Sequence, residues 1–372
     1  MEEEFLATIF YSLAGEGRGH ATRARTLIEA LRHQHELVIF APDLAYDLLE
    51  PVYRDTEITV ERIPGLKFSY NRKGRVRILG TLLSNTDYIA RMQQRAAAMM
   101  PMFDKHRPDL VISDFEPILP RAARIRGIPL VSFDHQHFLV VSDLSSLPTM
   151  LRHQANLAAP FVRAFYDWQV ETVVSSFYRV PLKPDVRNVT QIGTLIRPEV
   201  KSVKPQSDGF LLAYMRRHPV PGLFSAFDAL GMPVKLYGLG VHPDRGNVQF
   251  RAVDERRFVE DLACCEAVAT TAGNQLVGEA LYLRKPVLAI PEPNNFEQAV
   301  NAHYLQLTGT GRSVTRELRA SDLRDFIDDL DALRSRIVPE AVFGNDDALR
   351  AIERHIMLPN VRASRAPFLS AV

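Results

Sequence analysis

Short apolar segments rich in β-forming residues alternate with amphipathic helical segments along most of this chain. Strands that are apolar along their whole length are typical of a parallel sheet covered by helices on both faces. The alternation therefore predicts an α/β fold. In the first half, the expected strands are residues 5–13, 37–41, 58–63, 110–113 and 130–133, and the expected helices are residues 21–33 and 82–103.

The alternation pauses at residues 193–208, which contain two prolines, and then starts again. We predict two doubly wound, Rossmann-like domains, residues 1–192 and 193–372, that face each other across a cleft at the carboxyl ends of their strands. The last helix is free to pack back on the first domain. In the second half, the expected strands are residues 210–214, 234–237, 267–270 and 287–290, and the expected helices are residues 223–230, 255–264, 275–283, 322–337 and 348–356.

The charge balance excludes one large class of function. Lys and Arg total 45 against 44 Asp and Glu, whereas a nucleic-acid binder should show a basic excess. The only cysteines, Cys264 and Cys265, are adjacent, so they predict neither a disulfide framework nor a zinc cluster. The acidic start and the lack of a 20-residue apolar segment predict a cytoplasmic protein and leave peripheral membrane contact open.

A glycine-rich loop, Gly-Glu-Gly-Arg-Gly-His at residues 15–20, joins the first strand to the first helix. Backbone amides at such a helix start can hold an anion, so Gly17, Arg18 and Gly19 are candidates for contact with a phosphate or an acceptor. A dinucleotide fingerprint would require glycine where His20 stands. Asp43 follows the second strand, where an acid could bind a ribose, which keeps an oxidoreductase open.

His20 is the candidate catalytic base. The positive end of the helix dipole favours a neutral imidazole, which could take a proton from an acceptor hydroxyl. Asp114 ends a strand on the same sheet edge and is the candidate residue that orients the imidazole. The other candidates on the first-domain side of the cleft are Glu116, His135, Gln136 and His137; the histidines have no partners at metal-ligand spacing, so we predict polar lining and no metal site.

A second constellation lies in the other half. Residues 270–279 (TTAGNQLVGE) follow a strand and begin a helix whose amides could hold a diphosphate. Glu279 could accept hydrogen bonds from a ribose. After the next strand, Glu297 and Gln298 offer the acceptors and donors that sugar hydroxyls need.

Residues 270–302 resemble the donor-site motif of GT-B glycosyltransferases. That motif has a glycine-rich turn, Glu six residues after the glycine, and a later D/E-Q-x-x-N-A. Residues 17–20 and 193–197 (GTLIR) resemble the N-acetylglucosaminyltransferases that complete the lipid-linked peptidoglycan precursor. The whole chain is also similar to poorly characterised bacterial and archaeal glycosyltransferases that begin G-E-G-x-G-H.

The resemblance implies a nucleotide-sugar donor, commonly a UDP-sugar, inversion at the anomeric carbon, and no metal or other cofactor. It assigns the ribose to Glu279, the diphosphate to Gly273, Asn274 and Gln275, the sugar to Glu297 and Gln298, and the interdomain donor contact to Arg197. The chain departs from the motif at Thr271-Ala272, in place of His-Gly, and at Leu276, in place of Ser or Thr. Arg216 or Arg217 could supply the missing phosphate contact.

The acceptor should bind the first domain. The basic and aromatic run at residues 67–77 could rest on anionic lipid and admit a lipid-linked acceptor, although a small-molecule acceptor fits as well. Three alternatives stay open: a sugar-nucleotide 2-epimerase or hydrolase on the same fold, an NAD(P)-dependent oxidoreductase, and a sensor of nucleotide sugars without catalysis.

Overall fold

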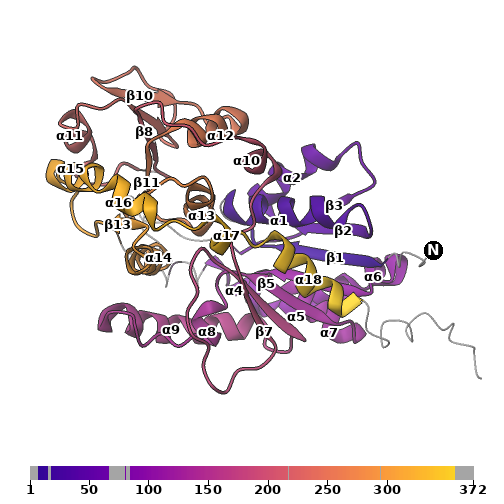
Figure 1. Cartoon of the computed structure of the whole chain (residues 1–372). Helices are drawn as coiled ribbons and strands as arrows, with labels where there is room; N and C mark the ends of the chain where they lie inside the picture. The colour runs from indigo at the N-terminus through magenta and orange to yellow at the C-terminus, as the bar shows by residue number, and fades with distance from the viewer. Residues whose placement is uncertain are drawn as a thin grey trace, which may run out of the picture.

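The computed structural model describes residues 7–15, 18–66, 80, 84–216, 218–293 and 295–356, without the side chain of Arg18. The structure contains two parallel sheets, each in its own lobe with helices around it (Figure 1). The predicted α/β class is therefore confirmed. Gly17, Arg217 and the basic run 67–77 lie outside the described residues.

The first sheet has seven strands in the order β3-β2-β1-β4-β5-β6-β7. The chain moves outward from β1 in one direction and then returns to the other side of β1 with β4. A crevice opens at such a switch point, where ligands bind in doubly wound folds. The strands are β1 (Thr8–Leu13), β2 (Glu36–Ala41), β3 (Thr59–Arg62), β4 (Leu110–Asp114), β5 (Leu130–Asp134), β6 (Glu171–Ser175) and β7 (Val189–Ile192).

The second sheet has six strands in the order β10-β9-β8-β11-β12-β13. Its switch point lies between β8 and β11, so the loops after these two strands border the second crevice. The strands are β8 (Leu211–Tyr214), β9 (Val234–Tyr237), β10 (Val248–Arg251), β11 (Ala267–Thr270), β12 (Val287–Ala289) and β13 (Gly311–Ser313).

The helix expected at residues 82–103 is broken where the structure describes it, and its last segment continues to His106. It separates at Arg91 and at Met99, and Pro101 in the first turn of α6 explains the second break, because proline cannot continue a preceding helix. The helices of the first lobe are α1 (Arg18–Leu31), α2 (Asp43–Tyr53), α4 (Thr86–Ala90), α5 (Met92–Ala98), α6 (Met100–His106), α7 (Ile118–Arg126), α8 (Phe138–Val141) and α9 (Thr149–Phe165).

The helix expected at residues 322–337 is also two helices, which separate at Asp329. The helices that follow β7 are α10 (Pro198–Ser202), α11 (Leu223–Asp228), α12 (Glu255–Cys264), α13 (Asn274–Tyr282), α14 (Phe296–Thr308), α15 (Ala320–Asp328), α16 (Leu330–Ser335), α17 (Pro339–Val342) and α18 (Asn345–Ile356).

The C-terminal helix α18 crosses back to the first lobe (Figure 1). Its buried residues, Ala348, Ala351, Ile352 and Ile356, join the apolar cluster of α1, α2 and the first sheet. A hydrogen bond fastens its end, because His355 Nε2 lies 2.5 Å from Glu171 Oε2 on β6. The boundary between residues 192 and 193 stays a prediction.

Two segments cross between the lobes side by side. Residues Thr194 and Phe343 form a parallel bridge, and the Gly344 amide donates to the Thr194 carbonyl at 3.0 Å. The Asn345 side chain brackets the backbone of Ile196 with two hydrogen bonds of 2.8 and 2.9 Å. Both crossings are thereby held together, so movement of the lobes must bend them as a pair.

Gly278 allows α13 to pack against this crossing. A Cβ at Gly278 would overlap the Oγ1, Cβ and Cγ2 atoms of Thr194, whereas a Cβ at Gly273, the N-cap of the same helix, meets no atom within 4 Å. We expect Gly278→Ala to lower the free energy of unfolding by about 1–3 kcal/mol through overpacking. Gly273→Ala should change it by less than about 0.5 kcal/mol. Urea unfolding of both variants measures the difference, and equal effects would contradict the packing argument.

Candidate functional site

His20 and Asp114 meet at the switch point of the first sheet. His20 lies in the first turn of α1, and Asp114 is the last residue of β4. The Nδ1 atom of His20 is 2.8 Å from Oδ1 of Asp114, which is fully buried, while His20 stays partly exposed. With its Nδ1 proton held by the carboxylate, a neutral imidazole presents the lone pair of Nε2. The pair that the sequence predicts as base and orienting residue is thus in contact.

Arg23 is a third member of this contact, and the sequence analysis missed it. Its Nε donates to Asp114 Oδ2 at 3.0 Å and its Nη2 to Oδ1 at 2.5 Å. Burial alone would lower the pKa of the Arg23 guanidinium, but the charge and the hydrogen bond of Asp114, with smaller contributions from Tyr11 and Asp134, together raise that pKa. The spacing of three residues after His20 on one helix was the available signal, because such residues share a helix face.

Three residues that are not glycine adopt left-handed backbone conformations just after strands. They are Asp43 after β2, Phe115 after β4 and Ala272 after β11, with φ values of 43°, 59° and 65°. Such conformations cost on the order of 1–3 kcal/mol each and cluster at functional sites. They turn the chain sharply at the carboxyl ends of the strands. Phe115 and Ala272 follow strands that border the two switch points, and Asp43 follows the strand next to β1.

The start of α13 has the features of an anion site. Gly273 is the N-cap, no side chain among the described residues caps the first turn, and space in front of Gly273 is open. The first helical hydrogen bond runs from the Val277 amide to the Gly273 carbonyl at 3.1 Å. The amides of Asn274 and Gln275 precede that bond, so they can point to a negatively charged ligand.

The side chain of Asn274 is turned to the other lobe. Its Nδ2 donates to the Ser175 carbonyl at 3.1 Å, and its Oδ1 accepts from the Phe177 amide at 3.3 Å. Both polar atoms of the amide group are thus used between the lobes. A role of Asn274 at a diphosphate would therefore come from its backbone amide.

His135 also joins the lobes. Its Nδ1 lies 3.2 Å from the Ser175 carbonyl, and its Nε2 lies 3.0 Å from Oδ1 of Asn301 on α14. Burial lowers the pKa of His135, which favours the neutral ring with a single N–H. The neutral ring can donate to one of these two oxygens at a time. Gln136 contributes its Oε1, which accepts from the His135 amide at 3.3 Å.

Arg197 and Glu279, both predicted to contact the donor, contact each other. Arg197 donates to the Glu279 carboxylate from Nε and Nη2 at 2.8 Å each, and its Nη1 donates to Glu255 at 2.8 Å. Arg25 on α1 pairs with the same Glu255 at 2.9 Å. Burial tends to raise the pKa of Glu255, but the two arginines lower it. Gln275 adds a hydrogen bond from Nε2 to Glu279 Oε1 at 2.9 Å. The ion pairs that link Arg25, Glu255, Arg197 and Glu279 thus run from α1 in the first lobe to α13 in the second.

Glu297 and Gln298 lie in the first turn of α14. The Gln298 Oε1 accepts from the Glu292 amide at 2.8 Å, which shapes the loop before the helix. The Glu297 side chain makes no hydrogen bond with the side chains or backbone of the described residues, and its charge acts on the nearby His135 ring. Glu297 is therefore the more available of the two for a ligand.

A comparison with known families decides what this site belongs to. A family model described as Glycosyl transferase family 1 matches residues 7–331, which is most of the chain. The chain belongs to glycosyl transferase family 1. The match supports the predicted glycosyltransferase and does not favour the epimerase, hydrolase or oxidoreductase alternatives.

Proteins of similar sequence also carry the name glycosyltransferase. An uncharacterised glycosyltransferase of Methanosarcina mazei is 22% identical over 352 residues, which cover 86% of this chain and 90% of the relative. Another, of Methanosarcina acetivorans, is 24% identical over 349 residues, which cover 82% and 83%. The predicted similarity to the peptidoglycan enzyme is not among these findings and stays a prediction.

Solved structures confirm the predicted GT-B fold. The structure of LpCGTa in complex with UDP has a TM-score of 0.66 at 16% identity and covers 95% of this chain and 100% of its own. The calicheamicin glycosyltransferase CalG4 has a TM-score of 0.62 at 17% identity and covers 94% and 98%.

The remaining candidate residues of the glycosyltransferase lie at the rims of the two crevices. Glu116 caps α7, because its carboxylate accepts from the amides of Ile118 at 2.7 Å and Leu119 at 2.9 Å. Burial raises the pKa of Glu116. Arg216 follows β8, and Gly19 lies at the start of α1 with open space around its Cβ position.

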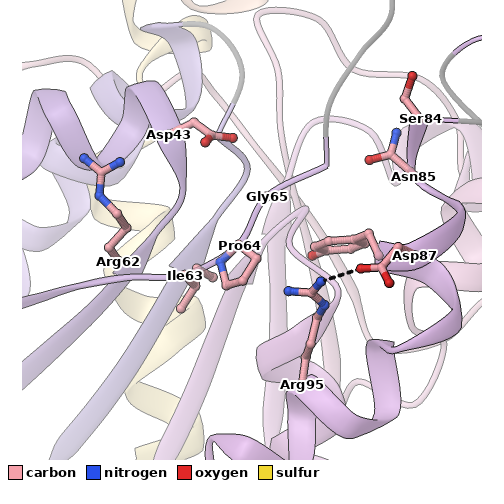
Figure 2. Close-up of a pocket in the computed structure, with 10 residues that line it drawn as sticks. Asp43, Arg62, Ile63, Pro64, Gly65, Ser84, Asn85, Asp87 and Arg95 are labelled. Atoms are coloured by element: carbon pink, nitrogen blue, oxygen red, sulfur yellow. Dashed lines mark hydrogen bonds and ion pairs between the residues drawn. The ribbon is translucent and has the colours of Figure 1, made fainter.

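A cavity of about 520 Å³ opens in the first lobe near the end of β3. Figure 2 shows polar side chains around it, with Arg95 paired to Asp87 at 3.1 Å. Asp43 is the only one of its lining residues that the sequence analysis considered, and for a different role. The lining is Asp43, Arg62, Ile63, Pro64, Gly65, Ser84, Asn85, Asp87, Tyr88 and Arg95.

No helix in the described part of the chain is long and apolar enough to cross a membrane. Among the same residues, no three His, Cys, Asp or Glu side chains gather as metal ligands would.

Proposed function

We propose that this glycosyltransferase moves a hexosyl group from a nucleoside diphosphate sugar, a UDP-sugar, to an acceptor hydroxyl. The observation that carries the proposal is the contact of His20 with Asp114 at the first switch point. It supplies an oriented imidazole at the place where a doubly wound domain opens to its ligand.

In the proposed reaction, His20 Nε2 takes the proton of the acceptor hydroxyl as its oxygen attacks the anomeric carbon. The new bond forms as the bond from that carbon to the diphosphate oxygen breaks, and the electron pair leaves with the diphosphate. Attack opposite the leaving group inverts the anomeric centre. Asp114 holds the Nδ1 proton and stabilises the imidazolium that forms.

The start of α13 is the proposed diphosphate site. Its uncapped amides and the open space at Gly273 suit a leaving group that gains negative charge. The UDP complex of the structurally similar LpCGTa supports a uridine nucleotide. Glu279 would accept from the ribose through the lone pair of Oε2 that Arg197 and Gln275 leave free, and Arg216 would add positive charge.

Glu297 and Gln298 are the proposed partners of the sugar hydroxyls, since they begin the helix that follows the next strand. Helix amides and arginines neutralise the leaving group in this proposal, so transfer proceeds without a metal or other cofactor. The acceptor is proposed to enter from the first lobe, where Gly17, Arg18 and Gly19 border His20 in the sequence and the cavity near β3 offers polar walls.

Calorimetry with UDP-hexoses and with NAD(P) tests the donor class. We expect a UDP-hexose to bind and NAD(P) to give no heat, and transfer to a hydroxyl acceptor to continue in EDTA with the opposite anomer as product. Binding of NAD(P) in place of the UDP-sugar would overturn the proposal. Release of a free or epimerised sugar, with no glycoside from any acceptor, would favour the hydrolase or epimerase.

A further inference from the structure

Arg23 occupies both oxygens of the carboxylate that orients the proposed base. Its Nε and Nη2 donate to Oδ2 and Oδ1 of Asp114, at 3.0 and 2.5 Å, and both side chains are almost completely buried. The same Nη2 lies 3.2 Å from Nδ1 of His20. The imidazole therefore faces a carboxylate and a guanidinium at nearly equal distances.

These two neighbours act on the imidazole with opposite signs. A carboxylate beside a histidine favours the protonated ring, whereas a guanidinium opposes it. Arginine keeps its charge throughout the working pH range, and the contact with Asp114 reinforces that charge. The hydrogen bond from His20 to Asp114 thus still fixes the imidazole, while the positive charge of Arg23 offsets the negative charge of Asp114.

We propose that Arg23 is a positioning residue that keeps His20 unprotonated, and hence able to act as a base, by cancelling the charge of Asp114. The proposal rests on the proposed function, in which His20 takes the acceptor proton. A bare Asp–His pair would instead hold a proton on the ring to higher pH.

Other groups near His20 leave this balance in place. Tyr11 on β1 is buried, and burial together with Asp114 raises its pKa, so it stays neutral. Asp134 on β5 is paired with His137 Nδ1 at 2.7 Å. The helices packed against α1 are α2, α13 and α18, and several of their charged residues are paired: Glu50 with Arg54, Glu279 with Arg197, and Asp347 with Arg350. Asp43 begins α2 and is another carboxylate at this edge of the sheet.

The pH dependence of kcat/KM tests the proposal in five variants. We expect Arg23→Met to move the ascending limb of the profile up by about one to two pH units, and Arg23→Lys to leave it within about half a unit. Asp114→Asn should lower the limb, because the guanidinium then acts alone. Arg23→Met/Asp114→Asn removes both charges and should bring the limb back near its original position. Arg32→Met, which removes an arginine paired with Glu29, is the control and should not move it.

The comparison of Asp114→Asn with the double variant decides the question even if Arg23→Met fails to fold, since neither leaves a carboxylate buried without a partner. The proposal is overturned if the ascending limb of the kcat/KM profile does not move to higher pH when Arg23→Met is introduced, whether into the unmodified protein or into Asp114→Asn. His20→Ala separates the two levels: if it keeps full activity, the proposed function fails. If it loses activity while the limb stays fixed in the Arg23 variants, only the role of Arg23 fails.

Discussion

His20→Ala lowers kcat for sugar transfer by about a thousandfold, within the range that general-base catalysis supplies. The expected loss follows from the contact between His20 Nδ1 and Asp114, which leaves Nε2 as the atom that meets the acceptor hydroxyl. Arg23 remains as the partner of the buried Asp114 carboxylate when the imidazole is removed, so the variant should fold and still bind the donor. Initial rates at saturating donor and acceptor, together with donor calorimetry, measure the two effects separately.

His33→Ala is the matched control, because His33 is an exposed histidine just after the same helix. It should leave kcat unchanged. A His20→Ala variant with near-normal kcat would contradict the assignment of the base. Loss of donor binding together with activity would instead place His20 at the donor.

The fold could be predicted wherever strands are short, apolar and bounded by clear turns. Residues 234–237 and 267–270 were expected with the bounds that β9 and β11 have. The strands that were missed carry polar residues. Glu171 begins β6, where its charge is paired with His355 on a helix 184 residues away. Val189–Ile192 is a half-exposed edge strand with the sequence VTQI, which lacks a continuous apolar run.

The candidate site could be predicted residue by residue but not contact by contact. Glycine loops and strand ends marked His20, Asp114, Gly273 and Glu279 from local pattern. Which charges pair depends on the tertiary arrangement, and Arg197 meets Glu279 across 82 positions of sequence. The role of Arg23 likewise appears only when β4 is placed beside α1.

The side chains of Asn274 and His135 show the same limit. Their positions after strands suggested contact with a ligand, since both lie at the cleft in an open two-domain arrangement. In the structure their polar atoms bind the opposite lobe, through Ser175 and Asn301. A pattern in one domain cannot reveal that the other domain supplies the partner, because that depends on how the lobes approach.

The second large effect is expected at Arg197. Arg197→Met should lower the free energy of unfolding by about 3–5 kcal/mol, because it leaves the buried carboxylate of Glu279 without its cation. Chemical denaturation followed by circular dichroism measures the loss.

Arg54→Met, which breaks the exposed pair of Arg54 with Glu50, is the control and should cost less than about 1 kcal/mol. Adding Glu279→Gln to Arg197→Met removes the stranded charge and should recover most of the stability. If the double variant is no more stable than Arg197→Met, the loss comes from packing at the crossing between the lobes, and the buried charge pair is not what holds Glu279 in place.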